Sequence, residues 1–138
     1  MREILFRGKR CDYGEWVQGF YVRADPHWHK NGIHKDWIAL GASANGGWFA
    51  LHNKYAVKAE TVGQFTGLTD KNGKKIFEGD IVQGKDRLEK HLEVFGYIDH
   101  KNGSFVITGD FMTHYRWLDY DVEVIGNIHD NHELLENP

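Results

Sequence analysis

Apolar and polar residues alternate along several short stretches of this chain, and turn-forming residues interrupt them at intervals typical of β-hairpins. The first two stretches, residues 4–10 and 15–23, are separated by Cys11-Asp12-Tyr13-Gly14. Asp and Gly supply the acceptor and the positive φ that a tight turn needs, so the pattern predicts an N-terminal hairpin. In the second stretch both alternating sets of side chains are largely apolar, which predicts that both faces of this strand are covered.

The pattern is weaker in the segment that follows this hairpin. Residues 24–37 break every periodicity and collect turn formers, which predicts an exposed loop. Residues 41–47, with the sequence GASANGG, predict a second and more flexible loop. The stretches 48–52 and 55–60 are expected to pair with each other as strands.

Residues 66–83 carry the clearest β pattern in the chain. Asp70-Lys71-Asn72-Gly73 predicts a type I turn closed by a glycine bulge. Glu78-Gly79-Asp80 predicts a sharp bend before an apolar strand, in which Gly adopts an unusual φ and Asp caps exposed backbone amides. The residues expected to fix these two bends are Asp70, Asn72, Gly73, Gly79 and Asp80.

The rest of the chain predicts one more hairpin, one strand and a short helix. Residues 93–99 and 104–108 flank His100-Lys101-Asn102-Gly103, which predicts a second turn of the same type. Residues 122–128 alternate as a strand with one buried side, and residues 130–136 leave room for one or two helical turns. Lys-Asn-Gly occurs three times at unequal spacing, which indicates reused turn chemistry and not an internal repeat.

Composition supports one folded domain. The chain has 138 residues, of which 41% are hydrophobic and 14% aromatic, enough to surround a single core. No long amphipathic helix is present, so the predicted fold class is mostly β. We expect a single domain over residues 1–138, in which an N-terminal β-meander (about 1–60) packs on a small SH3-like or partly open β-barrel (about 61–138) with a short C-terminal helical turn.

Charge and cysteine content narrow the function classes. The net charge of −3 disfavours a dedicated duplex-DNA binder, which is usually basic. Cations are concentrated in residues 1–10 and carboxylates in residues 109–138, which predicts attraction between the two ends within a chain or in a homo-oligomer. Cys11 is the single cysteine, and a core or strand-end thiol is favoured over a nucleophile. No apolar run is long enough to cross a membrane, so we expect cytoplasmic localisation.

The sharpest chemical pattern lies in the first predicted loop. His27 and His29 can point to the same side of an extended segment, and His34 and Asp36 follow closely. Imidazole is the commonest transition-metal ligand, so these residues form a candidate zinc or nickel site. No CxxC or HExxH pattern accompanies them, and the competing interpretation, solvated loop histidines without a cofactor, is favoured.

Two pairs of carboxylates are candidates for acid–base chemistry. Glu78 and Asp80, and likewise Asp119 and Asp121, stand two residues apart, which places each pair on one face of a strand. The glycine bend already gives the first pair a structural role. The chain carries no P-loop, Rossmann glycines, nucleophile elbow or zincin helix, so no catalytic residue is assigned and a binding protein is favoured over an enzyme.

Cations gather around the central bends, near aromatic residues such as Phe77 and Phe95. Small barrels bind single-stranded nucleic acid through cations along the backbone and rings that stack on bases. The competing interpretation places the rings in the core and the lysines on a solvated rim. Trp28 and Trp37, in or beside the irregular loop, are candidate partner anchors or a lid over the barrel end. The candidate cations are Lys71, Lys74, Lys75, Lys85, Arg87 and Lys90.

Three segments of the chain carry a family resemblance. They are the opening REILFRGKR with the later GEWVQG, the central TVGQFTGLTDKNGKKIFEGDIV and the closing VEVIGNIHDNHELL. Together they resemble the YopX family, small proteins encoded by bacteriophages, prophages and their bacterial hosts. The resemblance implies a phage or mobile-element origin, a mainly β fold, self-association and action inside a bacterial host cell. It supplies no reaction, cofactor or catalytic residue, and residues 25–55 and 111–120 carry no motif.

These observations favour a non-enzymatic accessory protein of phage or prophage origin that binds a host or phage macromolecule. The first alternative is a single-stranded nucleic-acid binding protein that uses the central cations. The second is a small metal-dependent enzyme that uses His27, His29 and His34.

Overall fold

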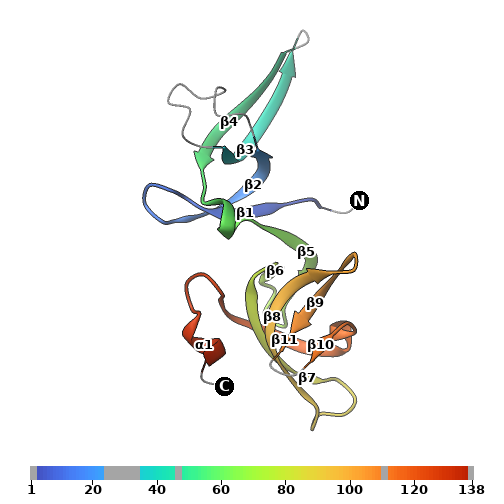
Figure 1. The fold of residues 1–138 in the computed structure, drawn as a ribbon. Helices are drawn as coiled ribbons and strands as arrows, with labels where there is room; N and C mark the ends of the chain where they lie inside the picture. Colours follow the sequence, from blue (N-terminus) through green and yellow to red (C-terminus); the bar gives the residue numbers. More distant parts are fainter. Residues whose placement is uncertain (1–2, 24–34, 46–47, 110–111, 137–138) are drawn as a thin grey trace. The chain divides into compact units, whose positions relative to one another are not determined.

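The computed structural model describes residues 3–23, 35–45, 48–109 and 112–136. The chain is mostly β, as the sequence predicts, and divides into two compact units, residues 1–64 and 65–138 (Figure 1). Strand β5 (Gly63–Thr69) begins in the first unit and continues into the second.

The first unit is built on an antiparallel meander. Each strand pairs with the one before it in the order β4-β3-β2-β1, and the start of β5 pairs with β1 at Phe6↔Gln64 and Arg7↔Gly63. One turn of 3-10 helix, η2, spans Ala59–Thr61. The meander strands are β1 (Phe6–Lys9), β2 (Trp16–Arg23), β3 (Asp36–Asn45) and β4 (Trp48–Ala56).

The predicted N-terminal hairpin is confirmed. Lys9 pairs with Trp16, the N–H of Arg10 donates to the carbonyl of Glu15 at 2.8 Å, and Gly14 adopts a φ of +71°. The prediction that both faces of β2 are covered is wrong at Phe20, whose side chain is 53% exposed. A strand with apolar residues on both faces is therefore not always covered on both faces when its sheet belongs to a small unit.

Two predicted loops are wrong in part, because much of their sequence is strand. Asp36 and Trp37 open β3, and residues 41–45 continue it instead of forming a flexible loop. The residues 24–34 and 46–47 of these loops lie outside the described residues. Residues 41–45 pair with β4, from Gly41↔His52 to Asn45↔Trp48, and this pairing outweighs the weak strand propensity of the Gly/Ala/Ser segment.

The predicted pairing of residues 48–52 with residues 55–60 is also wrong. Strand β4 runs without interruption from Trp48 to Ala56 and pairs with β3 from Asn45↔Trp48 to Trp37↔Ala56. Both segments lie along one partner, so they do not fold back on each other.

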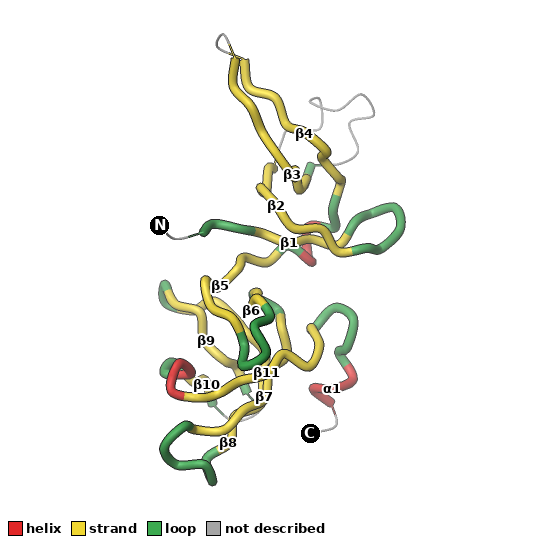
Figure 2. The backbone as a smooth tube through the Cα atoms, turned by 180° about the vertical axis from the view of Figure 1, so that it is seen from behind, coloured by secondary structure: helices red, strands yellow, loops and turns green. Residues whose placement is uncertain are grey.

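The second unit contains a five-stranded antiparallel sheet in the order β10-β9-β8-β7-β11 (Figure 2). β10 and β11 end this order, and no closed barrel is present among the described strands. The continuation of β5 pairs with β6 beside this sheet. Its elements are β6 (Lys75–Phe77), β7 (Asp80–Asp86), β8 (Glu93–Lys101), β9 (Ser104–Thr108), β10 (Thr113–His114), the 3-10 turn η3 (Trp117–Asp119), β11 (Tyr120–Asn127) and the helical turn α1 (Glu133–Glu136).

The core of the second unit lies on one face of this sheet. Val94 of β8 and Val122 of β11 both stand opposite Gly84 of β7. A Cβ at Gly84 would lie 2.3 Å from the carbonyl oxygen of Asp121, so only glycine permits this close approach of the strands. The core residues are Ile76, Val82, Val94, Ile98, Ile107, Trp117 and Val122.

The predicted turn at residues 70–73 is confirmed. The N–H of Gly73 donates to the carbonyl of Asp70 at 3.0 Å, and Gly73 has a φ of +84°. One carboxylate oxygen of Asp70 accepts from the N–H groups of Asn72 and Lys74, both at 2.9 Å, and the other accepts from the N–H of Val124 at 3.0 Å. Asp70 therefore both shapes its own turn and binds it to β11.

These hydrogen bonds also set the acidity of Asp70. Burial alone raises the pKa of this carboxyl, but the N–H donors of Val124, Lys74 and Asn72 outweigh it, so the pKa lies below its ordinary value. Asp70 is thus a charged anchor within the fold.

The predicted bend at Glu78-Gly79-Asp80 is confirmed as well. Gly79 has a φ of +93°, and the Asp80 carboxylate accepts the N–H of Phe77 at 2.8 Å. Asp80 is only 1% exposed, which gives it the predicted capping role.

The second hairpin is tighter than predicted. Lys101 pairs with Ser104, so Asn102 and Gly103 alone form the turn, with φ values of +52° and +81°. Two consecutive positive φ values define a type I′ turn and not a type I turn with a bulge. The type I′ geometry follows the right-handed twist of the strands, which favours it in a long regular hairpin.

Candidate binding groove

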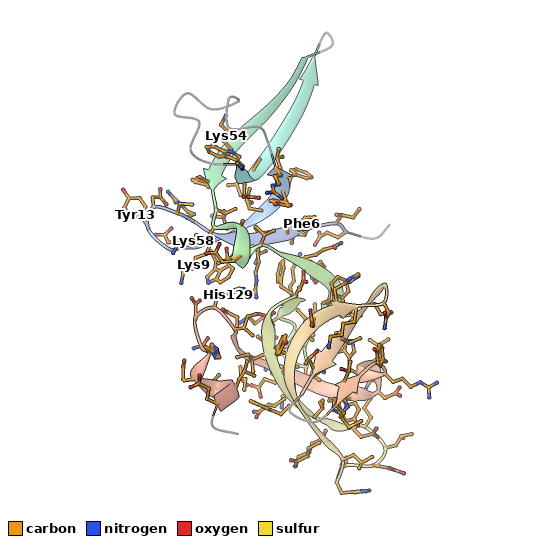
Figure 3. All side chains as sticks on the ribbon, viewed as in Figure 1. Phe6, Lys9, Tyr13, Lys54, Lys58 and His129 are labelled. Carbon is orange, nitrogen blue, oxygen red and sulfur yellow. The ribbon has the colours of Figure 1, made fainter. Side chains whose placement is uncertain are left out.

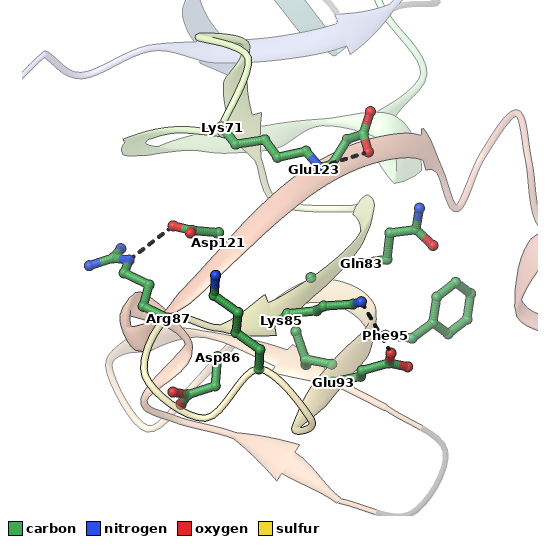
Figure 4. A pocket seen from close by; sticks show the side chains of 12 residues that line it. Lys71, Gln83, Lys85, Asp86, Arg87, Glu93, Phe95, Asp121 and Glu123 are labelled. Carbon is green, nitrogen blue, oxygen red and sulfur yellow. Dashed lines mark hydrogen bonds and ion pairs between the residues drawn. The ribbon is translucent and has the colours of Figure 1, made fainter.

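Four of the six predicted cations line one hollow of the second unit, with a volume of about 550 Å³ (Figure 4). They are Lys71 from the β5–β6 turn, Lys85 from the end of β7, and Arg87 and Lys90 from the β7–β8 loop. Lys74 and Lys75 do not line it. We call this hollow the charged groove; its other lining residues are Gln83, Gly84, Asp86, Glu93, Val94, Phe95, Asp121 and Glu123.

The groove side chains come from alternate positions on three neighbouring strands. Lys85 on β7 stands opposite Glu93 on β8 and Asp121 on β11. One pair along, Gln83 stands opposite Phe95 and Glu123. Because side chains alternate between the two faces of a sheet, the positions between them carry core residues such as Val122. The groove therefore occupies the polar face of β8, β7 and β11.

Ion pairs cross this polar face. The Lys71 Nζ lies 3.6 Å from a Glu123 carboxylate oxygen, and the Lys85 Nζ lies 3.9 Å from one of Glu93. The shortest pair joins Arg87 Nε to Asp121 at 3.0 Å. All three pairs are solvent-exposed, so each contributes about 0–1 kcal/mol and can exchange for a partner's charges.

Asp86 and Lys90, the two charged groove residues outside these ion pairs, differ in whether the fold itself engages their charge. The Asp86 carboxylate accepts the N–H groups of Glu89 and Leu88, both at 2.8 Å, and these bonds lower its pKa below the ordinary value. Its charge is therefore used within the β7–β8 loop. Lys90 is exposed, and no ion pair joins it to any residue in the described part of the chain. It is the cation most available to a partner.

Exposed leucines lie near the groove residues Arg87 and Lys90. Leu88 is 94% exposed and Leu92 is 40% exposed on the β7–β8 loop. Leu118 is 56% exposed, and its carbonyl accepts a hydrogen bond from the Arg87 guanidinium at 2.7 Å. The sequence prediction missed these three leucines. For Leu88 and Leu92 the signal is an apolar residue in a charged loop that continues neither flanking strand, whereas Leu118 lies in η3.

Trp37, a predicted partner anchor or lid, lies in β3 and is 5% exposed. The Nζ of Lys54 lies 5.6 Å from the centre of a Trp37 ring (Figure 3 labels Lys54). This burial leaves little of the indole for a partner. Trp28, the other predicted anchor, lies outside the described residues.

The predicted histidine site is described only at Asp36. His27, His29 and His34 lie outside the described residues. The Asp36 carboxylate accepts the Tyr21 hydroxyl at 2.5 Å and lies 3.9 Å from Arg23. Burial, followed by this hydrogen bond, raises the pKa of Tyr21 to about 12. In the described part of the chain, no three or more His, Cys, Asp or Glu side chains come together in a way that could hold a metal ion.

Asp80 and Asp121, from the two predicted carboxylate pairs, and Cys11 make contacts that belong to the fold itself. Asp80 caps the bend described above, and Asp121 pairs with Arg87 on the groove face. Partial burial raises the pKa of the Cys11 thiol, which keeps it protonated and weakly nucleophilic. Its N–H bonds to the carbonyl of Ala56, at the end of β4.

Two cations of the basic N-terminal segment are engaged within the first unit. Arg7 is 8% exposed, with its guanidinium carbon 4.7 Å from the centre of a Trp16 ring. Arg10 donates two hydrogen bonds to Asp12, at 2.8 and 2.6 Å, beside Tyr13 at the tip of the first hairpin (Figure 3). Two of the four cations in residues 1–10 thus have partners within their own unit, and the attraction between the chain ends stays a prediction.

The described part of the chain contains no helix with the length and apolar character of a membrane span. These elements define a mostly β protein with a charged groove on one sheet. The sequence model of the YopX protein family matches residues 5–136, and the chain belongs to this family.

A solved structure supports the fold. The crystal structure of protein EF1440 from Enterococcus faecalis is similar with a TM-score of 0.58 and 25% sequence identity, covering 98% of this chain and 99% of that one. A comparison with curated proteins finds no match. The comparisons thus give a family and a fold without a described activity.

Proposed function

We propose that this chain is a non-enzymatic binding protein that recognises a macromolecular partner, most directly another protein, through the charged groove. The observation that carries the proposal is the convergence of Lys71, Lys85, Arg87 and Lys90 in one hollow of about 550 Å³. The proposed partner is a host or phage macromolecule.

The charge pattern of the groove supports a protein partner. Three of its cations already face carboxylates, so the surface offers both signs of charge in fixed register. Complementary surfaces with both signs set orientation and specificity in protein association. The exposed Leu88, Leu92 and Leu118 add the apolar area that such an interface buries.

A site-specific cross-linker tests this proposal. Gln83 is exposed and stands between Phe95 and Glu123 on the groove face, so a photoreactive amino acid placed there points to the partner's position. Expressed in the native cells, the protein should give a discrete cross-linked species after irradiation. The same amino acid at Lys58, exposed in the first unit, should not give that species.

A matched pair of charge reversals identifies the surface. Lys90→Glu changes the groove cation that has no ion pair in the described residues, and Arg116→Glu changes an exposed cation of the same unit outside the groove. We expect Lys90→Glu alone to weaken the cross-link at Gln83. Equal yields for both variants and the unmodified protein would contradict the groove as the binding surface.

Single-stranded nucleic acid is the second candidate partner, because four cations and Phe95 line the same groove. Phosphates would have to displace Glu123, Glu93 and Asp121 from their ion pairs. Removing these competitors with Glu93→Gln and Asp121→Asn should then strengthen binding to a labelled oligonucleotide. Fluorescence anisotropy at low salt measures this, with log affinity falling by about 0.7 per contacted phosphate for each tenfold rise in salt. Binding that is absent in both proteins excludes this candidate.

The phage or prophage origin and a homo-oligomeric state remain proposals. The family resemblance supports both, and the genes beside this one test the first directly. Light scattering across ionic strengths tests the second: a salt-independent monomer contradicts charge-driven association between the chain ends.

A further inference from the structure

Asn102 and Gly103 form an open, exposed turn of the second unit. They are the two residues between the paired Lys101 and Ser104, and both are exposed. A Cβ built on Gly103 meets no atom within 4 Å, so nothing crowds this peptide bond. Within the described part of the chain, no hydrogen bond engages the Gly103 N–H.

Asn72 and Gly73 provide a natural comparison, because they carry the same residue pair in another exposed turn. There the Gly73 N–H donates to the carbonyl of Asp70 at 3.0 Å. The two asparagine amides are held alike: Asn72 Nδ2 lies 3.4 Å from Glu123, and Asn102 Nδ2 lies 3.3 Å from the Tyr115 hydroxyl. The turns therefore differ in backbone type, since Asn102 has a φ of +52° and Asn72 does not have a positive φ, and in the freedom of the glycine nitrogen.

We infer that Asn102 is a site of spontaneous deamidation in the folded protein, catalysed by no external enzyme. The Gly103 nitrogen loses its proton and forms a bond to the Asn102 side-chain carbonyl carbon. The bond to Nδ2 breaks, ammonia leaves, and a five-membered succinimide remains. One water then opens the ring at either carbonyl and gives aspartate or isoaspartate. One water enters and one ammonia leaves, without oxidation or reduction.

The two products change the turn in different ways. Both add a negative charge beside His100 and Lys101 at the tip of the β8–β9 hairpin. Isoaspartate also adds one methylene to the main chain of a turn that has only two residues, which disturbs the Lys101↔Ser104 pairing. The groove residues of β8 are Glu93, Val94 and Phe95, at the other end of the strand, so the modified site is separate from the proposed binding groove.

The test compares Asn102 and Asn72 in the same molecule. The full chain is incubated in native buffer and, in parallel, unfolded in urea, and then digested and mapped by mass spectrometry. In the unfolded chain both sites should convert at similar rates, because each is an Asn-Gly pair preceded by Lys. In the folded chain conversion at Asn72 should fall well behind conversion at Asn102. Conversion should accelerate with rising pH, because the attacking nitrogen must lose a proton.

Asn102→Gln is the matched variant, since its longer amide keeps the same chemistry but closes a less favourable six-membered ring. It should abolish conversion at this position and leave Asn72 unchanged. An isoaspartyl methyltransferase assay on the peptide that contains residue 102 separates isoaspartate from aspartate. Equal protection of both asparagines in the folded protein, or faster conversion at Asn72, would overturn the inference; this comparison needs no variant to fold.

Discussion

The turn at residues 70–73 and the turn at residues 100–103 share the tripeptide Lys-Asn-Gly but differ in the residue before it. Asp70 accepts the N–H groups of Asn72 and Lys74, which closes a type I turn with a glycine bulge. In the second turn His100 stands in that position and joins the strand, pairing with Phe105, so the reversal shrinks to Asn102 and Gly103. The carboxylate of Asp70 therefore supports the wider turn, and His100 offers no such acceptor.

The same side chain also decides how far each turn reaches. Asp70 binds Val124 of β11, more than fifty residues away in sequence. The second turn closes a hairpin between consecutive strands. In the described part of the chain, the hydrogen bond that leads from this turn out of the hairpin is the exposed one from Asn102 to Tyr115. We infer that the first turn supports the tertiary structure, whereas the second shapes one hairpin.

The largest expected effect in this comparison is that of Asp70→Ala. It leaves the N–H groups of Lys74 and Val124 without their acceptor and should lower the free energy of unfolding by about 2–4 kcal/mol. Asn102→Ala should cost about 1 kcal/mol, because only the positive φ of its backbone is strained. Urea denaturation of both variants measures the difference. Equal losses would show that the two turns contribute alike.

The next largest effect is expected in the acid dependence of stability, to which Asp70 of the first turn should contribute. The pKa of Asp70 is lowered in the folded state, so its contribution is fully present above the unfolded value of about 3.9. It is lost as the pH falls through the lower folded value. Stability measured between neutral pH and pH values below about 4 should therefore decline less steeply in Asp70→Asn than in the unmodified protein. The same slope in both proteins would remove Asp70 as a source of acid sensitivity.

Substitution of the two turn glycines should give smaller and similar effects. Gly73 and Gly103 have φ values of +84° and +81°, and a Cβ on either would meet no atom within 4 Å. Backbone strain alone then operates, and Gly73→Ala and Gly103→Ala should each cost about 1 kcal/mol. A large difference between their midpoints in thermal unfolding would mean that the turns differ at the glycine and not at the residue before the tripeptide.

The smallest expected effect is that of Lys71→Ala. It removes the exposed ion pair with Glu123, 3.6 Å long, and should change the unfolding free energy by about 0–1 kcal/mol. The difference should shrink further as salt is added. A loss comparable to that of Asp70→Ala would show that the groove charges, and not the buried carboxylate, hold this turn to β11.

Much of the second unit was predictable because its signals are local. Gly79 and Asp80 carry their bend in three consecutive residues, and the structure confirms it. The first unit was harder to predict: residues 41–45 look like a loop alone and become strand only because β4 pairs with them. Their backbone is satisfied by a partner that sequence propensity does not include.

The candidate site likewise combines residues that the sequence identified with residues that only strand pairing brought together. The sequence grouped six cations, of which Lys71, Lys85, Arg87 and Lys90 line the groove and Lys74 and Lys75 do not. It gave no sign that Glu93 and Glu123 would face them, since those pairings depend on strand register.

By itself, the sequence determined the first hairpin turn, the turn at residues 70–73 and the bend at residues 78–80, because each of these rests on φ values and side-chain acceptors within about four residues. Tertiary structure alone decided which strands distant in sequence became neighbours, and therefore that β11 runs beside β7 and completes the groove. Register between distant strands follows from burying one common core, and this is a property of the whole unit and not of any short segment.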